Sequence, residues 1–287
     1  MSTGRPSPDP AEILDLAEVW FIEPSFADLP DERFTAALTE LPGDQARLLI
    51  DEESDPLCMA VYTPDSTWVA GCFQLRPPTA ALITRFEELC GDIYQEERSL
   101  WEAAVRGCFS REIAGQVTPA LEDLNPARIG MVDSLIAEVW GEGGGRSCID
   151  CGCGSGVGSL VLRERGFRPL SCDNDPSLLS LGLSTGRLIP EDTMCIDATL
   201  IRDYTGHCDM GMGCMFGEIH DFNAGMWETI TGELVLLTDR CLITVGTRRE
   251  ADLICSWVGQ WGAGARVFEN TRDIIYDRFV CDIVRED

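Results

Sequence analysis

The densest group of residues that could do chemistry lies in the segment 147–158, Ser-Cys-Ile-Asp-Cys-Gly-Cys-Gly-Ser-Gly-Val-Gly. A short apolar run ends in Asp150, and Gly152, Gly154 and Gly156 follow at every second position. Glycine permits sharp backbone turns and lets a ligand approach the main chain without a Cβ in the way. Backbone amides at the start of a helix can hold a polar or negatively charged ligand group. The segment therefore predicts a ligand-binding loop between a strand and a helix.

Two further acidic residues stand at the ends of the next two expected strands. Asp173 follows the apolar run at 168–172, and Asp197 follows Thr-Met-Cys-Ile. A carboxylate at the end of the second strand can accept hydrogen bonds from both hydroxyls of a ribose. Together with Asp150, these residues place acids at three successive strand ends, a pattern that predicts one shared ligand site.

The glycine spacing distinguishes between two kinds of nucleotide-binding loop. Dinucleotide-binding folds use Gly-x-Gly-x-x-Gly, and this spacing fails because residue 157 is valine. Asp150 followed by Gly152, Gly154 and Gly156 instead closely resembles the first motif of the class I S-adenosylmethionine-dependent methyltransferases. The resemblance spans roughly residues 126–284, and it implies a methyltransferase whose cofactor is S-adenosylmethionine.

The resemblance also assigns roles to individual residues at this site. It implies that Asp150 and the three glycines form the cofactor loop. It implies that Asp173 binds the ribose hydroxyls and that Asn174 lies against the adenine ring. Asp197 would accept a hydrogen bond from the adenine amino group, and the backbone of Ala198 would lie near the ring.

The same segment allows two other interpretations. Glycine and aspartate are common turn residues at strand ends, so the loop could be turn chemistry without a ligand. Cys148, Cys151 and Cys153 could suggest a metal or iron–sulfur site. However, Cys148 lies on the expected buried strand, and a cluster would occupy the cofactor loop, so we predict no metal.

Candidate catalytic residues follow the expected strand at 207–213, whose end should point toward the reacting methyl group. Glu218 and His220 lie in the loop that follows, and the pKa of histidine suits general-base catalysis near neutral pH. A surface histidine, metal ligation by the pair, and a thiolate acceptor that needs no base remain open alternatives. The Asn/Asp-Pro-Pro-Tyr/Phe tetrapeptide of enzymes that methylate amide or nucleobase nitrogen is missing. Arg128 could pair with the cofactor carboxylate or lie on the surface.

The elements that must position these residues follow from hydrophobic periodicity. From residue 146 onward, apolar runs alternate with helical patterns, which indicates an open, largely parallel α/β sheet. Strands are expected near 146–150, 168–172, 193–197, 207–213, 240–246, 265–270 and 278–284, and helices near 156–165, 176–183, 224–237 and 249–260. No helix separates the last two strands, so they should form an antiparallel pair. The expected fold class is α/β, with a Rossmann-like seven-stranded, mostly parallel sheet and an antiparallel last strand.

The region before this sheet has a different pattern. Helical spacing over 10–21, 31–40, 80–90, 92–106, 110–123 and 126–140 predicts several helices. The segment 58–75 fits a hairpin or a helical pair, because two apolar runs flank Pro-Asp-Ser-Thr. We therefore expect a mostly helical N-terminal region, 1–125, that shapes or covers the acceptor pocket, and a methyltransferase domain at 126–287.

Composition limits the partners. The chain has 287 residues, and 49 acidic against 22 basic residues give a formal charge of −27, which argues against binding nucleic acid. No membrane partner is expected. No run of 18 apolar residues and no apolar signal core appears, so a cytoplasmic protein with reduced cysteines is expected.

The methyl acceptor would be a small molecule or a protein side chain. The rival interpretations are an inactive cofactor-binding regulatory module and a nicotinamide-dependent oxidoreductase, which the glycine spacing disfavours. The oligomeric state does not follow from the sequence.

Overall fold

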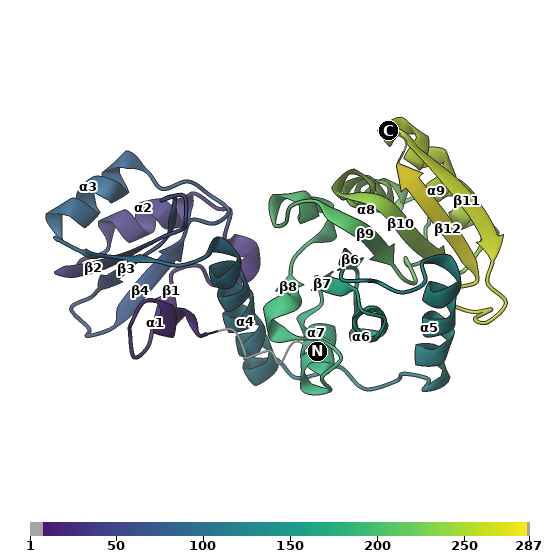
Figure 1. Cartoon of the computed structure of the whole chain (residues 1–287), viewed down its shortest axis with the longest axis horizontal. Helices are drawn as coiled ribbons and strands as arrows, with labels where there is room; N and C mark the ends of the chain where they lie inside the picture. The colour runs from purple at the N-terminus through teal and green to yellow at the C-terminus, as the bar shows by residue number, and fades with distance from the viewer. Residues whose placement is uncertain (1–7, 286–287) are drawn as a thin grey trace. The chain divides into compact units, whose positions relative to one another are not determined.

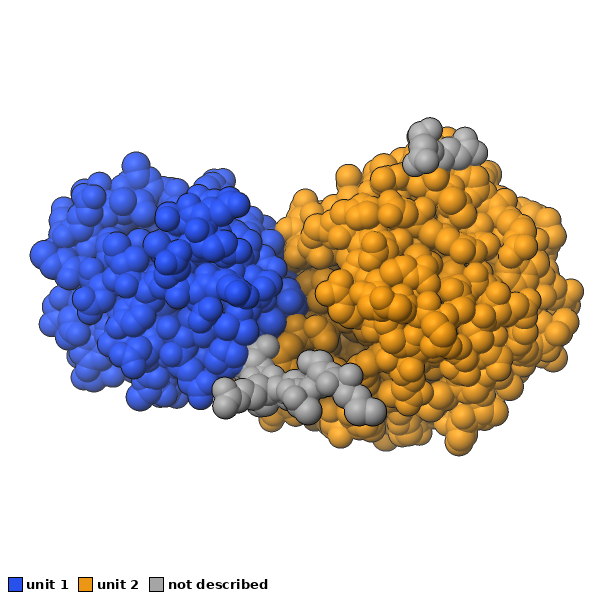
Figure 2. Space-filling view, viewed as in Figure 1, with its two compact units in different colours: residues 1–111 blue, residues 112–287 orange. Residues whose placement is uncertain are grey.

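The computed structural model describes residues 8–285, and the chain divides into two compact units, residues 1–111 and 112–287 (Figure 2). The sequence pattern placed the boundary at 125/126, whereas the division falls within helix α4 (Arg98–Gln116). Residues 117–122 belong to the second unit, where the Ser180 hydroxyl donates to the Val117 carbonyl at 2.9 Å and Arg187 pairs with Glu122 at 2.8 Å. In residues 8–285, no helix is long and apolar enough to cross a membrane.

The N-terminal unit is built around a five-stranded sheet in the order β1-β4-β3-β2-β5 (Figure 1). Its strands are β1 (Trp20–Phe21), β2 (Gln45–Ile50), β3 (Pro56–Tyr62), β4 (Trp68–Cys72) and β5 (Asp92–Gln95). Its helical segments are α1 (Pro10–Ile13), η1 (Phe26–Asp28), α2 (Arg33–Glu40), α3 (Ala80–Glu88) and the first part of α4. The expectation of a mostly helical region was therefore wrong.

The physical reason for this error is pairing between strands that are distant in sequence. Of the two alternatives for 58–75, the hairpin is present, because β3 and β4 pair antiparallel around the turn at 64–67. The segment 92–106 was expected to be one helix, but its first residues form β5, which pairs in parallel with β2. The packing of a strand against its neighbours overrides local helical spacing in such a segment. Similarly, α1 ends at Ile13 and Asp15 has a positive φ of 54°.

The C-terminal unit contains a seven-stranded sheet in the order β11-β12-β10-β9-β6-β7-β8 (Figure 1). Its strands are β6 (Ser147–Cys151), β7 (Arg168–Asp173), β8 (Thr193–Cys195), β9 (Cys208–Gly213), β10 (Thr238–Val245), β11 (Ala263–Glu269) and β12 (Phe279–Arg285). The ladder from β8 to β10 is parallel, and β12 runs antiparallel between β10 and β11. The predicted sheet and its antiparallel last strand are thereby confirmed.

Helices cover both faces of this sheet. They are α5 (Ala127–Val139), α6 (Val157–Glu164), α7 (Pro176–Ser184), α8 (Ala224–Leu237) and α9 (Arg248–Val258), with short 3-10 turns η2 (Pro190–Asp192), η3 (Ala198–Asp203) and η4 (Gly259–Trp261). Met210 and Met212 on β9 join the core cluster that contains residues of α5 and α6. Gly211 between them faces Leu234 of α8. Because side chains alternate along a strand, α8 covers the opposite face.

The strand order marks where a ligand would bind. From β6, the chain continues to β7 and β8 on one side of the sheet and then returns to β9 and β10 on the other. In open α/β sheets, ligands bind outside the carboxyl ends of the strands at such a reversal of strand order. The residues at the ends of β6, β7, β8 and β9 are therefore the ones to examine.

Candidate functional site

The loop after β6 is shaped by three glycines in the left-handed region. Gly152, Gly154 and Gly156 have φ values of 68°, 53° and 83°. A Cβ at Gly152 or Gly154 would meet no other atom of the protein within 4 Å, so backbone conformation rather than packing requires glycine at these two positions. A Cβ at Gly156 would also lie 2.6 Å from the side chain of Leu188. The loop thus turns its backbone outward immediately before α6.

The same loop is fixed to the neighbouring strand by its amides. Gly152 and Cys153 both donate backbone hydrogen bonds to the carbonyl of Cys172, at 2.9 and 3.0 Å. The next amide, that of Gly154, donates to the carboxylate of Asp173 at 2.8 Å. The end of β7 therefore sets the shape of the glycine loop, and Asp173 is brought directly against it.

Asp150 lies beneath the loop rather than on its surface. Its carboxylate is buried and accepts a 2.5 Å hydrogen bond from the hydroxyl of Ser159, and the backbone amide of Ser159 also bonds to it. Since the N-cap residue Gly156 has no side chain, Asp150 satisfies the first turn of α6 from the adjacent strand. Burial raises the pKa of Asp150 to about 7 against these hydrogen bonds, with Asp173 adding to the increase. Gly158 must lack a side chain, because a Cβ there would lie 2.9 Å from the Asp150 carboxylate.

Asp173 presents a partly buried carboxylate at the end of β7. One oxygen accepts from Gly154 and the other accepts from the amide of Asp175 at 2.9 Å. Burial raises the pKa of Asp173, and the backbone hydrogen bonds from Asp175 and Gly154 oppose this increase. Each carboxylate oxygen has a second lone pair, so Asp173 can still accept two hydrogen bonds from a ligand.

The end of β8 carries the other predicted cofactor residues. The amide of Ile196 donates to the carbonyl of Asp173 at 3.1 Å, which ties the ends of β7 and β8 together. Asn174 and Asp197 are both exposed. Asp197 caps η3, which begins at Ala198, and its Oδ1 accepts from the amide and the hydroxyl of Thr199 at 2.9 and 2.8 Å. The structure therefore brings the predicted residues to adjacent strand ends.

The turn after β9 is held by a chain of hydrogen bonds that the sequence did not reveal. Met215 has a φ of 56°, a conformation that long side chains rarely adopt. Its amide donates to the hydroxyl of Thr244 at 2.7 Å, and this hydroxyl donates to Asp277 at 2.5 Å. Arg128 on α5 pairs with Asp277 at 2.9 Å and with Asp273 at 3.3 Å. Arg128 thus pairs with two carboxylates of the protein itself. No pattern in the sequence predicts this pairing, because Asp273 and Asp277 lie about 145 positions further along the chain.

Glu218 and His220 lie together on the loop that follows. His220 Nε2 is 3.2 Å from Glu218 Oε2, and the two side chains are 50% and 89% exposed. The His220 ring stacks on that of Phe222 at a centroid distance of 5.5 Å. A surface hollow of about 400 Å³ next to them is lined by His220, Asp221, Phe222 and Arg249. Within this lining, Asp221 and Arg249 form an ion pair at 2.6 Å. The loop offers a proton-accepting group beside an exposed aromatic ring.

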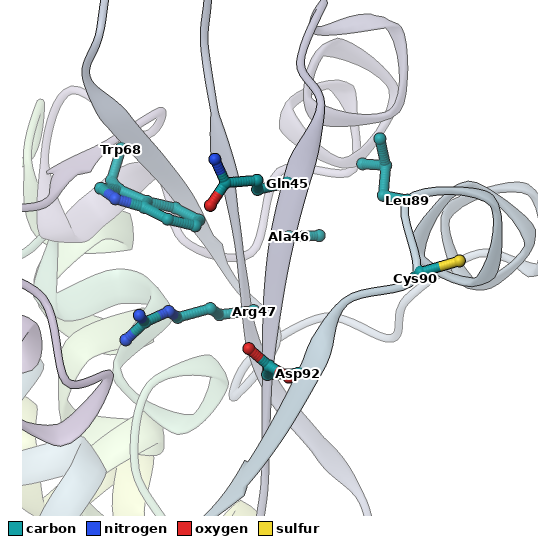
Figure 3. Close-up of a pocket in the computed structure, with 7 residues that line it drawn as sticks. All are labelled: Gln45, Ala46, Arg47, Trp68, Leu89, Cys90 and Asp92. Atoms are coloured by element: carbon teal, nitrogen blue, oxygen red, sulfur yellow. The ribbon is translucent and has the colours of Figure 1, made fainter.

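The N-terminal unit contains a smaller cavity of about 100 Å³ (Figure 3). Arg47 within it lies between the rings of Trp68 and Tyr94, at 5.3 and 5.1 Å, and 3.5 Å from the Asp15 carboxylate. The other lining residues are Gln45, Ala46, Leu89, Cys90 and Asp92. Small-molecule sites usually enclose about 300–1,000 Å³. This cavity is therefore smaller than most small-molecule sites.

No family model and no curated protein matches this sequence. Many solved structures of class I S-adenosylmethionine-dependent methyltransferases match the chain in structure, at low sequence identity. The magnesium protoporphyrin IX methyltransferase from Synechocystis PCC 6803, solved with bound S-adenosylmethionine, is 19% identical, with 64% of this chain and 97% of that chain covered and a TM-score of 0.46. The mitomycin 7-O-methyltransferase MmcR is 13% identical, with 78% of each chain covered and a TM-score of 0.43. A TehB-like methyltransferase from Corynebacterium glutamicum is 16% identical, with 64% and 98% covered and a TM-score of 0.41.

These matches describe a class of fold and nothing finer. Their identities are below 20% and their TM-scores below 0.5, so they carry no argument for a substrate or an activity. The glycine loop and the acids at the strand ends are the observations that bear on function.

Proposed function

We propose that the C-terminal unit binds S-adenosylmethionine and transfers its methyl group to a small molecule or a protein side chain. The observation that carries this proposal is the pairing of Asp173 with the glycine loop, in which Gly154 donates to the carboxylate at 2.8 Å. This arrangement places a carboxylate with spare lone pairs beside a turn in which every second residue is glycine. A nucleoside with a free ribose diol fits both features.

The chemistry of the donor set supports the same ligand. Burial raises the pKa of Asp173 although backbone amides donate to it, so further donors would stabilise its anion. Two ribose hydroxyls would supply these donors, and the carboxylate would hold the ribose in one orientation. Asp197 and the backbone of Ala198 follow the next strand, where they can accept from and contact an adenine ring, and the exposed Asn174 directly follows Asp173.

S-adenosylmethionine supplies a methyl group on a cationic sulfur that is already a good leaving group. The contribution of this chain is therefore mainly to orient the two reactants. Holding the acceptor atom about 3 Å from the methyl carbon is worth roughly 7–11 kcal/mol of the barrier. The rigid turn at Met215 fixes the loop after β9, which is the loop that carries Glu218 and His220.

We assign to His220 the role of accepting a proton from the methyl acceptor, or of orienting it, with Glu218 orienting the imidazole. The support is the 3.2 Å contact between the two side chains and the position of their loop after β9. Their exposure leaves the imidazole accessible to an acceptor that enters from solvent. The hollow beside Phe222 gives such an acceptor an aromatic surface to pack on.

Binding of S-adenosylhomocysteine to two alanine variants, measured by calorimetry, tests the cofactor assignment. Asp173→Ala should weaken binding about 5- to 150-fold, because the ribose hydroxyls lose their acceptor, a cost of about 1–3 kcal/mol. Asp209→Ala is the matched control. Asp209 also accepts from a backbone amide and a hydroxyl, those of Ser147, both at 2.7 Å, but it lies in β9 near the opposite edge of the sheet. Equal affinities of the two variants would refute the role of Asp173.

The catalytic assignment is tested by His220→Ala once an acceptor is known. We expect cofactor affinity to stay nearly unchanged while methyl transfer slows by roughly 100- to 10,000-fold. Glu218→Gln should have a smaller effect, because it removes only the charge beside the ring. Full activity of the His220 variant would show that transfer needs no base, and loss of cofactor binding would move His220 to the cofactor site. If the protein is an inactive binding module, the wild type and the His220 variant would both bind the cofactor and neither would transfer a methyl group.

A further inference from the structure

Two cysteines of the C-terminal unit lie against each other where α9 packs on β12. Cys281 is fully buried on β12, and its Sγ lies 3.8 Å from the carbonyl oxygen of Ala251. Residues four apart in a helix share one face, so Cys255 follows Ala251 along the surface that meets Cys281. The two thiols are close enough for each to shift the pKa of the other. Cys255 is partly exposed, whereas its partner is not.

The environment gives the two thiols different chemistry. The hydrogen bond from Cys281 lowers the pKa of Cys255, with a further contribution from Arg248, while burial and Asp252 oppose it. The same hydrogen bond and burial raise the pKa of Cys281. Arg248 and Asp252 form a 2.8 Å ion pair on the exposed side of α9. Cys255 is therefore the sulfur that ionises first and that solvent can reach.

Several other thiols among the described residues lack this combination. Burial raises the pKa of Cys58, Cys148 and Cys214, and each keeps its proton at neutral pH. Cys90 is exposed in the N-terminal unit, but within residues 8–285 no contact joins it to another thiol. The pair on α9 and β12 joins an accessible sulfur to a second sulfur within reach, which is the arrangement that thiol–disulfide exchange requires.

We propose that Cys255 and Cys281 form a modification site that reacts with low-molecular-weight disulfides such as oxidised glutathione. The Cys255 thiolate attacks one sulfur of oxidised glutathione, the disulfide bond of the reagent breaks, and one glutathione thiolate leaves. Cys281 then loses its proton and attacks Cys255, so that the second glutathione leaves and a bond forms between the two protein sulfurs. Two protein thiols and one oxidised glutathione give one protein disulfide and two reduced glutathiones.

The product covalently joins α9 to β12. The capping box of α9 includes Glu250, which also accepts from the amide of Ile219 at 2.9 Å, in the loop that carries Glu218 and His220. Oxidation would thus fix the helix on which this loop rests. The disulfide encloses residues 256–280 and should raise the Tm of the oxidised protein, because it restricts the unfolded chain.

Native full-length protein treated with oxidised glutathione, alkylated, digested and analysed by mass spectrometry tests the site. We expect a linked peptide pair joining Cys255 to Cys281 in the wild type and in the control variant Cys90→Ser. Cys281→Ser should instead retain one glutathione on Cys255, because the resolving sulfur is gone, and Cys255→Ser should form neither product. Glutathione retained on wild-type Cys255 without a linked pair would overturn the assignment of Cys281.

The rate of alkylation by iodoacetamide gives a second, independent readout. At pH 7, Cys255 should react faster in the wild type than in Cys281→Ala, which removes the hydrogen-bond donor, by about threefold for each unit by which the pKa falls, since the thiolate fraction rises while its nucleophilicity falls. Cys90 in the same samples should react equally in both proteins. Identical Cys255 rates in the two proteins would show that Cys281 does not activate it, and the proposal would fail even if both proteins fold normally.

Discussion

Glu23 in the N-terminal unit and Asp150 in the C-terminal unit are both 1% exposed, but their partners differ. Glu23 is paired with the guanidinium of Arg76, which also donates to the Thr35 hydroxyl at 2.8 Å and to the Leu29 carbonyl at 2.5 Å. Asp150 has a hydroxyl and a backbone amide as donors and the acid Asp173 nearby. Burial raises the pKa of both groups, and a cation opposes the increase only at Glu23.

The difference indicates what each carboxylate does. A buried ion pair with several hydrogen bonds holds loops and strands of the N-terminal unit together. An acid without a cation beneath a glycine loop stabilises no charge pair, and such groups are concentrated at binding sites. Asp150 supports the first turn of α6 and the loop before it, while Asp173 is the acid that we propose faces the ligand.

Among changes that test this difference between the two carboxylates, the largest effect on stability is expected at Arg76. Arg76→Met should lower the free energy of unfolding by about 3–5 kcal/mol, because it leaves the Glu23 charge buried without a cation. The double variant Glu23→Gln/Arg76→Met should recover much of this loss, since neither charge remains. Denaturant unfolding measures both variants. A double variant no more stable than Arg76→Met would show that the pair contributes through packing and not through charge.

Asp150 should make the free energy of unfolding fall as the pH rises. An ordinary ion-paired acid has the opposite effect. Its pKa rises from 3.8 to about 7 on folding, so the stability tied to its neutral form is present below pH 3.8 and is lost as the pH rises to about 7. The unfolding free energy of Asp150→Asn minus that of the wild type should therefore increase by about 3 kcal/mol between pH 5 and pH 8. The difference cancels the contributions of the other carboxylates. A difference that stays flat over this range would mean that Asp150 is ionised throughout.

The same contrast between the units appears in what the sequence could reveal. The alternating strands and helices from residue 146 onward depend on local periodicity, and the glycines at 152, 154 and 156 mark their own turn, so the sheet and the loop were predictable. Strand β5 pairs with β2, some 45 residues earlier, and its own residues carry no signal for this partner. The hydrogen bonds from Met215 to Thr244 and on to Asp277 likewise join residues about 30 positions apart. Such non-local contacts follow from tertiary packing and not from spacing along the chain.

The central claim is that the glycine loop and Asp173 form a site for S-adenosylmethionine and not for a dinucleotide. Calorimetric titration of the wild-type protein with S-adenosylhomocysteine, and separately with NAD, tests it most directly. The account predicts binding of S-adenosylhomocysteine with a Kd of roughly 1–100 μM, or −8 to −5 kcal/mol, and no heat from NAD. Saturable binding of NAD, or no binding of S-adenosylhomocysteine to protein freed of co-purified ligand, would contradict it.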